Sequence, residues 1–370
     1  MAPIPILLMV RRLNYGGCER DLAKVALGLD PSEFKPYVGC FRPDGLRVEE
    51  LRQAGVPIIE FPLKSFRSAG AVRAAMLMGR CIREHGIRLV HCFDVPTAMW
   101  GAPVARFWRT PVVCSQLSYR ALYSSGERRL LRITDRIATR IVVNCLAMQR
   151  HVTQDEGVPI QKTFLCYNGV DTSIFHPGPA LRPQELAGAS VVIGTVANLR
   201  EEKGIDLLLK GYALLRKVVS GTKLFIVGDG PEMENLQALA QQLAIEEDTL
   251  FLIGKPDISN EMRALDIFVL PSYSEAFSNA LLESMASGCA VLGSNIGGTP
   301  ELIEDGKNGL LFQCGSAEDL AAKLRIVVEN AELRARFQKA SAARARDEFS
   351  LQRNLAGFRK LYLSLTEAGA

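Results

Sequence analysis

The sequence is poor in histidine and has none of the spacings by which histidine and cysteine usually bind metals. Only 4 His occur in 370 residues, without an HxxxH or HExxH pattern, and the 9 Cys contain no CxxC pair. These counts argue against a metal site built from His or Cys. Most of the cysteines fall inside apolar runs, which is typical of small buried side chains in a reducing compartment. We therefore expect a cytoplasmic protein without a disulfide framework.

Long apolar runs are absent as well. The longest uncharged stretch near the N-terminus, residues 2–10, is interrupted by Pro3 and Pro5 and ends at Arg11. A helix that spans a bilayer needs about 18 apolar residues, and a secretory signal needs a basic segment before its apolar run. We expect neither feature here. The composition, 48% hydrophobic and 23% charged, also excludes a disordered, collagenous or coiled-coil protein.

Charge of one sign is unevenly spread, although the net charge is only +4. Residues 1–180 hold 24 Lys and Arg against 15 Asp and Glu, whereas residues 181–370 hold 20 against 25. A solvated helix face is one interpretation of the basic half; a surface for acidic lipid headgroups or a phosphorylated acceptor is the other. The second interpretation predicts peripheral attachment to the inner face of a membrane, and no nucleic-acid partner. The densest basic group is Arg128, Arg129, Arg132, Arg136 and Arg140.

Short apolar runs alternate with helical patterns along most of the chain, which favours parallel α/β sheets with helices on both faces. Residues 171–190 break this rhythm with Pro177, Pro179 and Pro183. We predict a first domain over 1–170, a linker over 171–190 and a second domain over 191–350. Residues 351–370 are expected to form a last helix, and residues 146–155 another. Two doubly wound domains would face each other across a ligand cleft.

Polar residues follow several predicted strands of the second half. Asn198, Arg200 and Lys203 come after the strand at 191–197, and their cations suit a diphosphate. A charged loop neutralised by its own glutamates is the plainer alternative. Gly228 lies in a GDGP turn at the next strand end.

A third loop carries Glu275 and leads into a helix that carries Glu283, with Ser278 and Asn279 as candidate caps. Carboxylates beside a helix start accept hydrogen bonds from hydroxyl groups, of which sugars have many. A simpler explanation of Glu283 is that its charge interacts with the dipole of the helix in which it stands. Cations, amide donors and carboxylates at one sheet edge together indicate a nucleotide-sugar pocket.

In the first half, Gly16 and Gly17 follow the first strand and precede a helix expected to open at Glu19. A chain without Cβ atoms lets backbone N–H groups approach an anion. The pair is not G-x-G-x-x-G, so a dinucleotide-binding oxidoreductase is disfavoured. Taken alone, the pair favours a plain tight turn.

The sequence EAFSNALLE at 275–283 resembles the E-x7-E motif of the retaining, family-4 GT-B glycosyltransferases (glycosyl transferases group 1). The segment that follows it, the NGVD at 168–171, the pair Lys203-Gly204 and the GDG at 228–230 are also similar. The resemblance extends over nearly the whole chain and is most specific from 191 to 312. It implies a GT-B fold and hexosyl transfer, with retention, from a nucleotide-sugar, with UDP the expected nucleotide. The acceptor would be a glycan, a glycolipid or a lipid-linked molecule. By the same resemblance, residues 1–170 would form the acceptor-side domain and residues 191–350 the nucleotide-sugar donor domain. The helix over 351–370 would cross back to the N-terminal domain.

The resemblance also implies roles for single residues. Lys203 would hold the donor diphosphate with a nearby Arg, Glu275 would face the transferred sugar, and Glu283 would bind the ribose hydroxyls. Backbone amides would contribute donor contacts, and no metal or other cofactor is expected, in keeping with the absence of Asp-x-Asp. The residues that would supply those amides are Phe277, Ser278 and Asn279 in the second half and Gly16 and Gly17 in the first.

Two positions depart from the family pattern. Asn198 stands where an Arg often precedes the Lys, so Arg200 is expected to substitute for it. The family's His-x-His becomes His91-Cys-Phe93, which leaves His91 as a buried strand residue and Asp94 as a candidate polar group for the acceptor or the reacting sugar. A nucleotide-sugar hydrolase or epimerase on the same scaffold, and a non-catalytic nucleotide-sugar sensor, remain alternatives.

Overall fold

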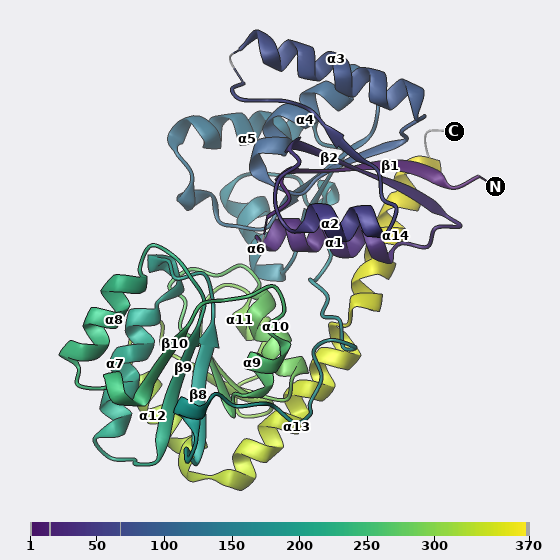
Figure 1. The fold of residues 1–370 in the computed structure, drawn as a ribbon. Helices are drawn as coiled ribbons and strands as arrows, with labels where there is room; N and C mark the ends of the chain where they lie inside the picture. The colour runs from purple at the N-terminus through teal and green to yellow at the C-terminus, as the bar shows by residue number, and fades with distance from the viewer. Residues whose placement is uncertain (1, 15, 67, 368–370) are drawn as a thin grey trace. The chain divides into compact units, whose positions relative to one another are not determined.

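The computed structural model describes residues 2–14, 16–66 and 68–367; residues 1, 15, 67 and 368–370 lie outside this description. The chain divides into two compact units (Figure 1). The first comprises the described residues up to Asn168 together with those from Gln352 onward, and the second spans Gly169–Leu351. Residues 171–190, which interrupt the sequence pattern, thus belong to the second unit.

The first unit contains a seven-stranded sheet in the order β3-β2-β1-β4-β5-β6-β7, in which every pairing is parallel. Its inner strands are buried on both faces, which explains why they read as continuous apolar runs. The strand order reverses between β1 and β4, and ligands bind in open α/β sheets at the carboxyl edge of such a point. The strands are β1 (Ile4–Arg12), β2 (Phe34–Arg42), β3 (Ile58–Glu60), β4 (Leu89–Cys92), β5 (Val112–Gln116), β6 (Arg140–Val143) and β7 (Thr163–Leu165).

Helices of the first unit begin at local capping signals. Asp94 accepts a hydrogen bond from the Thr97 N–H at the start of α4, and Ser124 and Glu127 form a capping box on α5. α1 begins at Gly17 rather than at the expected Glu19, so Gly17 is its first helical residue. The helices are α1 (Gly17–Gly28), α2 (Arg47–Gln53), α3 (Ala69–Glu84), α4 (Val95–Phe107), α5 (Ser125–Ile137), α6 (Leu146–Arg150) and α14 (Leu351–Glu367).

The predicted helix at 146–155 is wrong in its second half. α6 ends at Arg150, and residues 151–155 form a single π-helical turn. The Thr153 hydroxyl donates to the carbonyls of Gln149 and Arg150, at 2.8 and 3.2 Å. Such back-bonding from a Thr hydroxyl competes with regular α-helical pairing and accompanies the widened turn.

α14 packs onto the first unit although it ends the chain (Figure 1). The Tyr362 hydroxyl hydrogen-bonds Nδ1 of His91 on β4 at 2.6 Å, and Arg359 forms an ion pair with Glu33. Tyr362 is fully buried and belongs to the apolar core that β1, β2 and α1 share. The last helix therefore completes the first unit's core.

The second unit contains a parallel six-stranded sheet in the order β10-β9-β8-β11-β12-β13, so its order reverses between β8 and β11. Its strands are β8 (Val191–Val196), β9 (Thr222–Val227), β10 (Thr249–Leu252), β11 (Ile267–Leu270), β12 (Ala290–Ser294) and β13 (Gly309–Phe312). Its helices are α7 (Ile205–Arg216), α8 (Met233–Gln242), α9 (Ser259–Arg263), α10 (Asn279–Ala286), α11 (Thr299–Leu302), α12 (Ala317–Glu329) and α13 (Ala331–Glu348). The predicted pair of doubly wound parallel sheets is confirmed.

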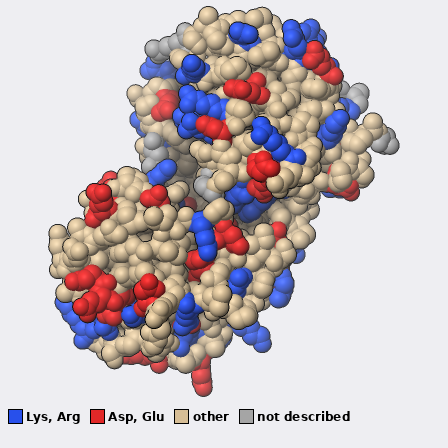
Figure 2. All heavy atoms as spheres, viewed as in Figure 1, with Lys and Arg blue, Asp and Glu red and all other residues tan. Residues whose placement is uncertain are grey.

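The two units differ in surface charge, as the sequence indicates. On the face in Figure 2, Lys and Arg are prominent on the first unit, and Asp and Glu form clusters on the second. No helix in the described part of the chain combines the length and apolar composition needed to cross a bilayer.

Candidate functional site

The loop after β8 is shaped by Gly204. This loop makes one 3-10 turn over Glu201–Lys203 and then passes through Gly204 at φ 64°. A Cβ atom at Gly204 would lie 2.2 Å from the carbonyl oxygen of Pro271. Only glycine fits this left-handed conformation at so close an approach. The consequence is that Lys203 is held against the loop that follows β11.

The loops after β8 and β11 are tied together by hydrogen bonds. The Tyr273 N–H donates to the Glu202 carbonyl at 2.9 Å, and the Tyr273 hydroxyl donates to the Asp206 carboxylate at 3.0 Å. β8 and β11 flank the point where the order of this sheet reverses. The tied loops therefore lie at the edge where an open α/β sheet binds its ligands.

Lys203 and Glu275 meet on these loops. Nζ of Lys203 donates to Oε2 of Glu275 at 2.8 Å, and the Ser272 hydroxyl lies 3.4 Å from the same oxygen. The side chains of Lys203 and Glu275 are 28% and 11% exposed. An ammonium has three N–H donors, so one bond to Glu275 does not exhaust it. The structure thus joins the predicted phosphate-binding cation to the predicted sugar-facing carboxylate.

Glu283 lies inside the second unit rather than on its surface. It stands in α10, and only 1% of it is exposed. Ser278 caps this helix by accepting a hydrogen bond from the Leu281 N–H at 3.2 Å, so the predicted cap is confirmed. Asn279 is instead the first helical residue. Because burying a carboxylate is costly, Glu283 is more than a solvated partner of the helix dipole.

The remaining predicted residues of the second unit differ in exposure. Phe277 is buried with its ring 5.7 Å from that of Phe349, so its side chain is part of the core. Arg200 is 60% exposed, and its guanidinium lies 3.9 Å from Glu202. Asn198 is also exposed. The structure therefore does not join Arg200 or Asn198 to the pair of Lys203 and Glu275.

The close approach of two loops explains why position 228 is a glycine. It adopts φ 155°, and a Cβ atom there would lie 1.8 Å from the carbonyl oxygen of Ala197. The loops after β8 and β9 could not approach so closely with a side chain at this position. Its predicted contact with a donor stays a prediction.

Gly16, Gly17 and Asp94 belong to the first unit. Gly16 caps α1, and a Cβ atom at Gly17 would meet nothing within 4 Å, so packing does not require glycine at position 17. The Asp94 carboxylate accepts hydrogen bonds from the Arg11 N–H at 2.6 Å and from the Thr97 hydroxyl at 2.6 Å. Burial raises the pKa of Asp94, and these bonds oppose that rise. Its carboxylate is therefore engaged in shaping the carboxyl ends of β1 and β4.

His91 is a buried strand residue, as the sequence indicates. It is fully buried, and its ring hydrogen-bonds the Tyr362 hydroxyl at 2.6 Å and the Ser115 hydroxyl at 2.9 Å. Burial lowers the pKa of His91 to about 3. A neutral ring enclosed in this way connects β4, β5 and α14.

Sequence reasoning missed the residues that hold the loops of Lys203 and Glu275 together. Asp206 and Tyr273 are 67 residues apart, and Ser272 stands just before the motif that carries Glu275. No spacing rule relates Asp206 to Tyr273. Their pairing follows from the adjacency of β8 and β11 in the sheet.

Replacing the buried carboxylate at position 283 tests its predicted role at the ribose. We expect Glu283→Gln to raise the donor KM about tenfold and to leave kcat nearly unchanged, because ribose contacts contribute equally in the ground and transition states. Steady-state kinetics over a range of donor concentrations measures both constants. Glu261→Gln is the matched control, since Glu261 is 5% exposed in the same unit. A fall in kcat at constant KM would contradict the ribose role.

The chain matches two families along its length. Residues 180–344 match the family described as Glycosyl transferases group 1, and residues 15–174 match the Glycosyltransferase Family 4. A GDP-mannose-dependent alpha-mannosyltransferase of Corynebacterium glutamicum is 37% identical over 331 residues, which are 83% of this chain and 72% of that protein. A D-inositol 3-phosphate glycosyltransferase of Segniliparus rotundus is 26% identical over 254 residues, 66% of this chain. That match spans only 56% of the relative's own length.

Solved structures are similar over the whole chain. HepE of Anabaena, in complex with UDP and glucose, has a TM-score of 0.85 and 23% identity, covering 97% of this chain and 99% of that one. Sucrose-phosphate synthase of Thermosynechococcus elongatus has a TM-score of 0.85 and 18% identity, covering 99% and 100%. At these identities the similarity concerns the fold, which is GT-B. Together with the two family matches and the Corynebacterium relative, this establishes that the chain belongs to glycosyltransferase family 4.

Proposed function

We propose that this protein transfers a sugar, with retention at the anomeric carbon, from a nucleotide-sugar to a glycan, glycolipid or lipid-linked acceptor. The observation that carries the proposal is the 2.8 Å pair of Lys203 and Glu275 on tied loops, at the edge where the second sheet reverses its strand order. At this edge, the cation suits the diphosphate of a nucleotide-sugar and the carboxylate suits the hydroxyl groups of its sugar.

In the proposed mechanism, Lys203 stabilises the departing diphosphate. The charge that develops on the leaving oxygen is balanced by the ammonium and by backbone N–H groups at the start of α10, near Phe277 and Ser278. A bound diphosphate accepts hydrogen bonds from the N–H donors of the ammonium that Glu275 does not use. The carboxylate of Glu275 then accepts hydrogen bonds from sugar hydroxyls. Because one loop holds the cation and a tied loop holds the carboxylate, both are positioned before the donor binds.

The donor is proposed to be UDP-linked, as expected from the family resemblance, with GDP-mannose as the second candidate. The 37% identical relative is named as GDP-mannose-dependent, which favours including that donor. Thermal shift with UDP-sugars and GDP-mannose, followed by nucleotide release with and without candidate acceptors, tests the proposal. Release that needs an acceptor supports transfer. Conversion of the donor to product without any acceptor indicates a hydrolase or epimerase, and binding without turnover indicates a sensor.

We also propose that the protein works in the cytoplasm and that α5 attaches it to the inner face of a membrane. Leu130 and Ile133 on this helix are each 47% exposed, while Leu131 is buried. Leu130 and Ile133 are three residues apart, so they share one side of the helix. The exposed arginines of α5 lie beside them, namely Arg128, Arg129, Arg132 and Arg136. This combination of exposed apolar and basic side chains suits the surface of an acidic bilayer.

Binding to vesicles tests this surface. Each basic residue near an acidic bilayer contributes about 1 kcal/mol, and the attraction fades within a Debye length of about 8 Å. We expect sedimentation with phosphatidylglycerol vesicles at low salt, weakened at high salt, and reduced about tenfold in Leu130→Ser/Ile133→Ser. The control is Ile326→Ser, because Ile326 is 48% exposed on the second unit. Binding that ignores salt and both substitutions would contradict the proposal.

A further inference from the structure

The first unit holds a pocket whose lining includes none of the predicted site residues. Its volume is 340 Å³, within the range of small-molecule sites, and it is lined by the ends of β1 and β2, the segment after β3 and the first turns of α4 and α5. β1 and α4, which follows β4, flank the reversal of strand order in this sheet. A ligand in the pocket would therefore lie at the edge where open α/β sheets bind their ligands.

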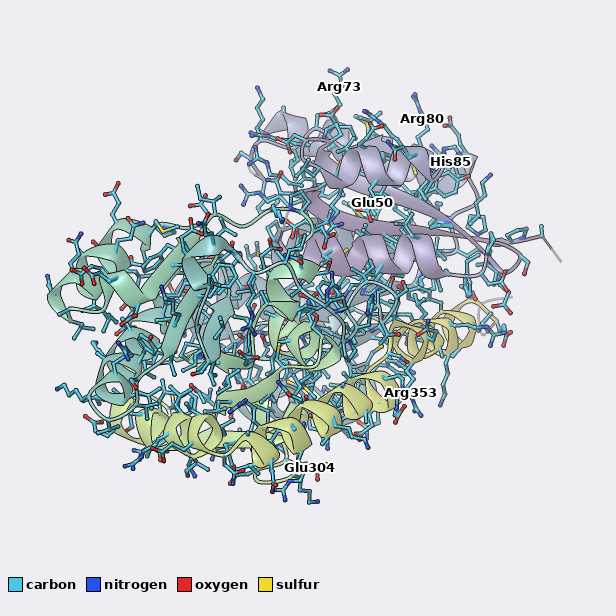
Figure 3. The ribbon with its side chains drawn as sticks, turned by 60° about the horizontal axis from the view of Figure 1, so that its bottom comes forward. Glu50, Arg73, Arg80, His85, Glu304 and Arg353 are labelled. Atoms are coloured by element: carbon cyan, nitrogen blue, oxygen red, sulfur yellow. The ribbon has the colours of Figure 1, made fainter. Side chains whose placement is uncertain are left out.

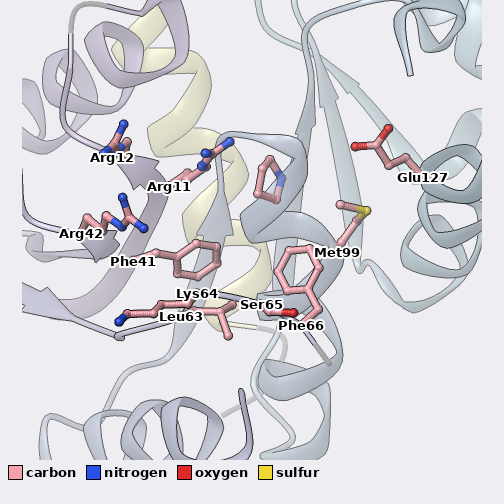
Figure 4. A pocket seen from close by; sticks show the side chains of 11 residues that line it. Arg11, Arg12, Phe41, Arg42, Leu63, Lys64, Ser65, Phe66, Met99 and Glu127 are labelled. Atoms are coloured by element: carbon pink, nitrogen blue, oxygen red, sulfur yellow. The ribbon is translucent and has the colours of Figure 1, made fainter. Parts of the chain in front are cut away.

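Cations dominate one side of this pocket (Figure 4). Arg11, Arg42 and Lys64 line it and are exposed to solvent. Among the described residues, no carboxylate forms an ion pair with any of these three side chains. A fourth cation, Arg12, pairs with Asp44 at 3.0 Å.

Glu127, which lies across the pocket from the arginines in Figure 4, is already engaged. Its carboxylate accepts hydrogen bonds from the N–H and the hydroxyl of Ser124, at 2.9 and 2.7 Å, and these bonds lower its pKa. It therefore serves the α5 cap and forms no ion pair with the three cations, of which Arg11 is attracted by the nearby Asp94 carboxylate.

An apolar surface lies beside these cations. The rings of Phe41 and Phe66 lie 6.5 Å apart in an edge-to-face arrangement. Phe41 is buried, whereas Phe66 is 43% exposed at the pocket. An exposed aromatic ring next to unpaired guanidinium groups offers an apolar contact and an anion contact to one ligand.

We propose that this pocket binds the acceptor through a phosphate group attached to an apolar body. That the ligand is the acceptor rests on the proposed function, whereas its phosphate and apolar parts are inferred from the pocket alone. Planar guanidinium groups bind phosphate by paired hydrogen bonds, and Lys64 adds a point charge. The phosphate can belong to a soluble phosphate ester or to a lipid headgroup. Glu127 brings the first turn of α5 to the pocket, so a lipid phosphate would reach it from the same helix that carries Leu130 and Ile133.

The probe for the first test is phenyl phosphate, titrated calorimetrically into the full-length protein. We expect Arg42→Gln and Lys64→Gln each to weaken binding about tenfold, the effect of losing one charge-assisted hydrogen bond. Arg73→Gln is the matched control, because Arg73 is an exposed cation of the same unit that projects outward from α3 (Figure 3). We expect this control to bind phenyl phosphate as the parent does.

Two further comparisons separate the parts of the proposal. Phe66→Ala should lower the affinity for phenyl phosphate to that for inorganic phosphate. The same substitution should leave the binding of inorganic phosphate unchanged. Benzyl alcohol, which lacks the phosphate, should not bind. Vesicles that contain phosphatidic acid in phosphatidylcholine distinguish the sources. Vesicle binding lost in Arg42→Gln assigns a lipid phosphate, and binding of phenyl phosphate alone assigns a soluble ester.

The proposal is overturned if phenyl phosphate does not bind, if benzyl alcohol binds as well, or if Arg42→Gln and Lys64→Gln bind like Arg73→Gln. Circular dichroism of each variant shows that it is folded, and these positions are exposed, so the substitutions test binding rather than stability. Nucleotide release is measured separately. Donor turnover with no pocket binding rejects this inference alone, whereas pocket binding without donor turnover rejects the proposed function alone.

Discussion

Lys203→Ala is expected to lower kcat at saturating donor by about tenfold to a hundredfold. A charge-assisted hydrogen bond to a departing diphosphate is worth about 1.5–3 kcal/mol. The proposed mechanism assigns this bond to Lys203, whose Nζ lies 2.8 Å from Glu275. The measurement is nucleotide release under acceptor-saturated conditions. Lys203→Arg should recover part of the loss, because it keeps the charge but changes the donor geometry.

The control for Lys203 is a lysine of the same unit with a similar partner and no place at the site. Lys307 is 78% exposed and pairs with Glu304 at 2.7 Å, so Lys307→Ala should leave turnover unchanged. Turnover of Lys203→Ala near that of Lys307→Ala would remove Lys203 from the mechanism. It would also leave the 2.8 Å pair with Glu275 as a structural ion pair between the two loops.

Arg120→Met is expected to lower the free energy of unfolding of the first unit by about 3–5 kcal/mol. Arg120 is 1% exposed, and its guanidinium donates to Asp135 at 2.6 Å and to Glu156 at 3.2 Å. The substitution removes the buried cation between Asp135 and Glu156 and leaves Glu156 only its 3.4 Å pair with the 61% exposed Arg132. Removing one partner of a buried ion cluster costs more than the cluster itself contributes, because the remaining charges stay desolvated.

Tryptophan fluorescence during urea unfolding measures this loss selectively. Trp100 and Trp108 are the two tryptophans of the chain, and both lie in the first unit. Arg80→Met is the control, because its pair with Glu84 is exposed and 3.9 Å long, and such pairs contribute about 0–1 kcal/mol. Equal unfolding midpoints for the two variants would contradict the prediction.

The loss in free energy of unfolding caused by Arg120→Met should also depend on pH. Burial raises the pKa of Asp135 above its ordinary value even beside Arg120, and loss of the cation raises it further. A carboxyl whose pKa is raised in the folded state lowers the free energy of unfolding at neutral pH. This loss is recovered as the pH falls and the group takes up a proton. The difference between Arg120→Met and the parent should therefore shrink from pH 7 to pH 4. A simple packing defect would not change with pH.

Local sequence features predicted most strands and most helices of this protein. Continuous apolar runs specified the strands, because a strand buried on both faces needs an apolar side chain at nearly every position. Ser278 was recognisable as a cap because capping depends on residues only three positions apart. Residues 151–155 were predicted wrongly, because the Thr153 hydroxyl competes with the helical pattern.

The site could be predicted in part. Lys203 and Glu275 were recognised as candidates one by one, from the loops in which they stand and from the resemblance of the motif. Their contact was not predictable from spacing, because 72 residues separate them and the order of β8 and β11 brings them together. The bond between Tyr273 and Asp206 depends on the same adjacency.

The sequence by itself determined the two parallel α/β units, the family motifs and the uneven charge, because each depends on residue types over short distances. Only the tertiary structure decided which side chains are exposed to solvent and which are buried or already hydrogen-bonded. It turned Leu130 and Ile133 toward solvent, enclosed His91 beneath α14, and engaged Asp94 at the start of α4. It also gathered Arg42, Lys64 and Phe66 around one pocket. Contacts of this kind are set by strand order and helix packing, which join segments that are far apart along the chain.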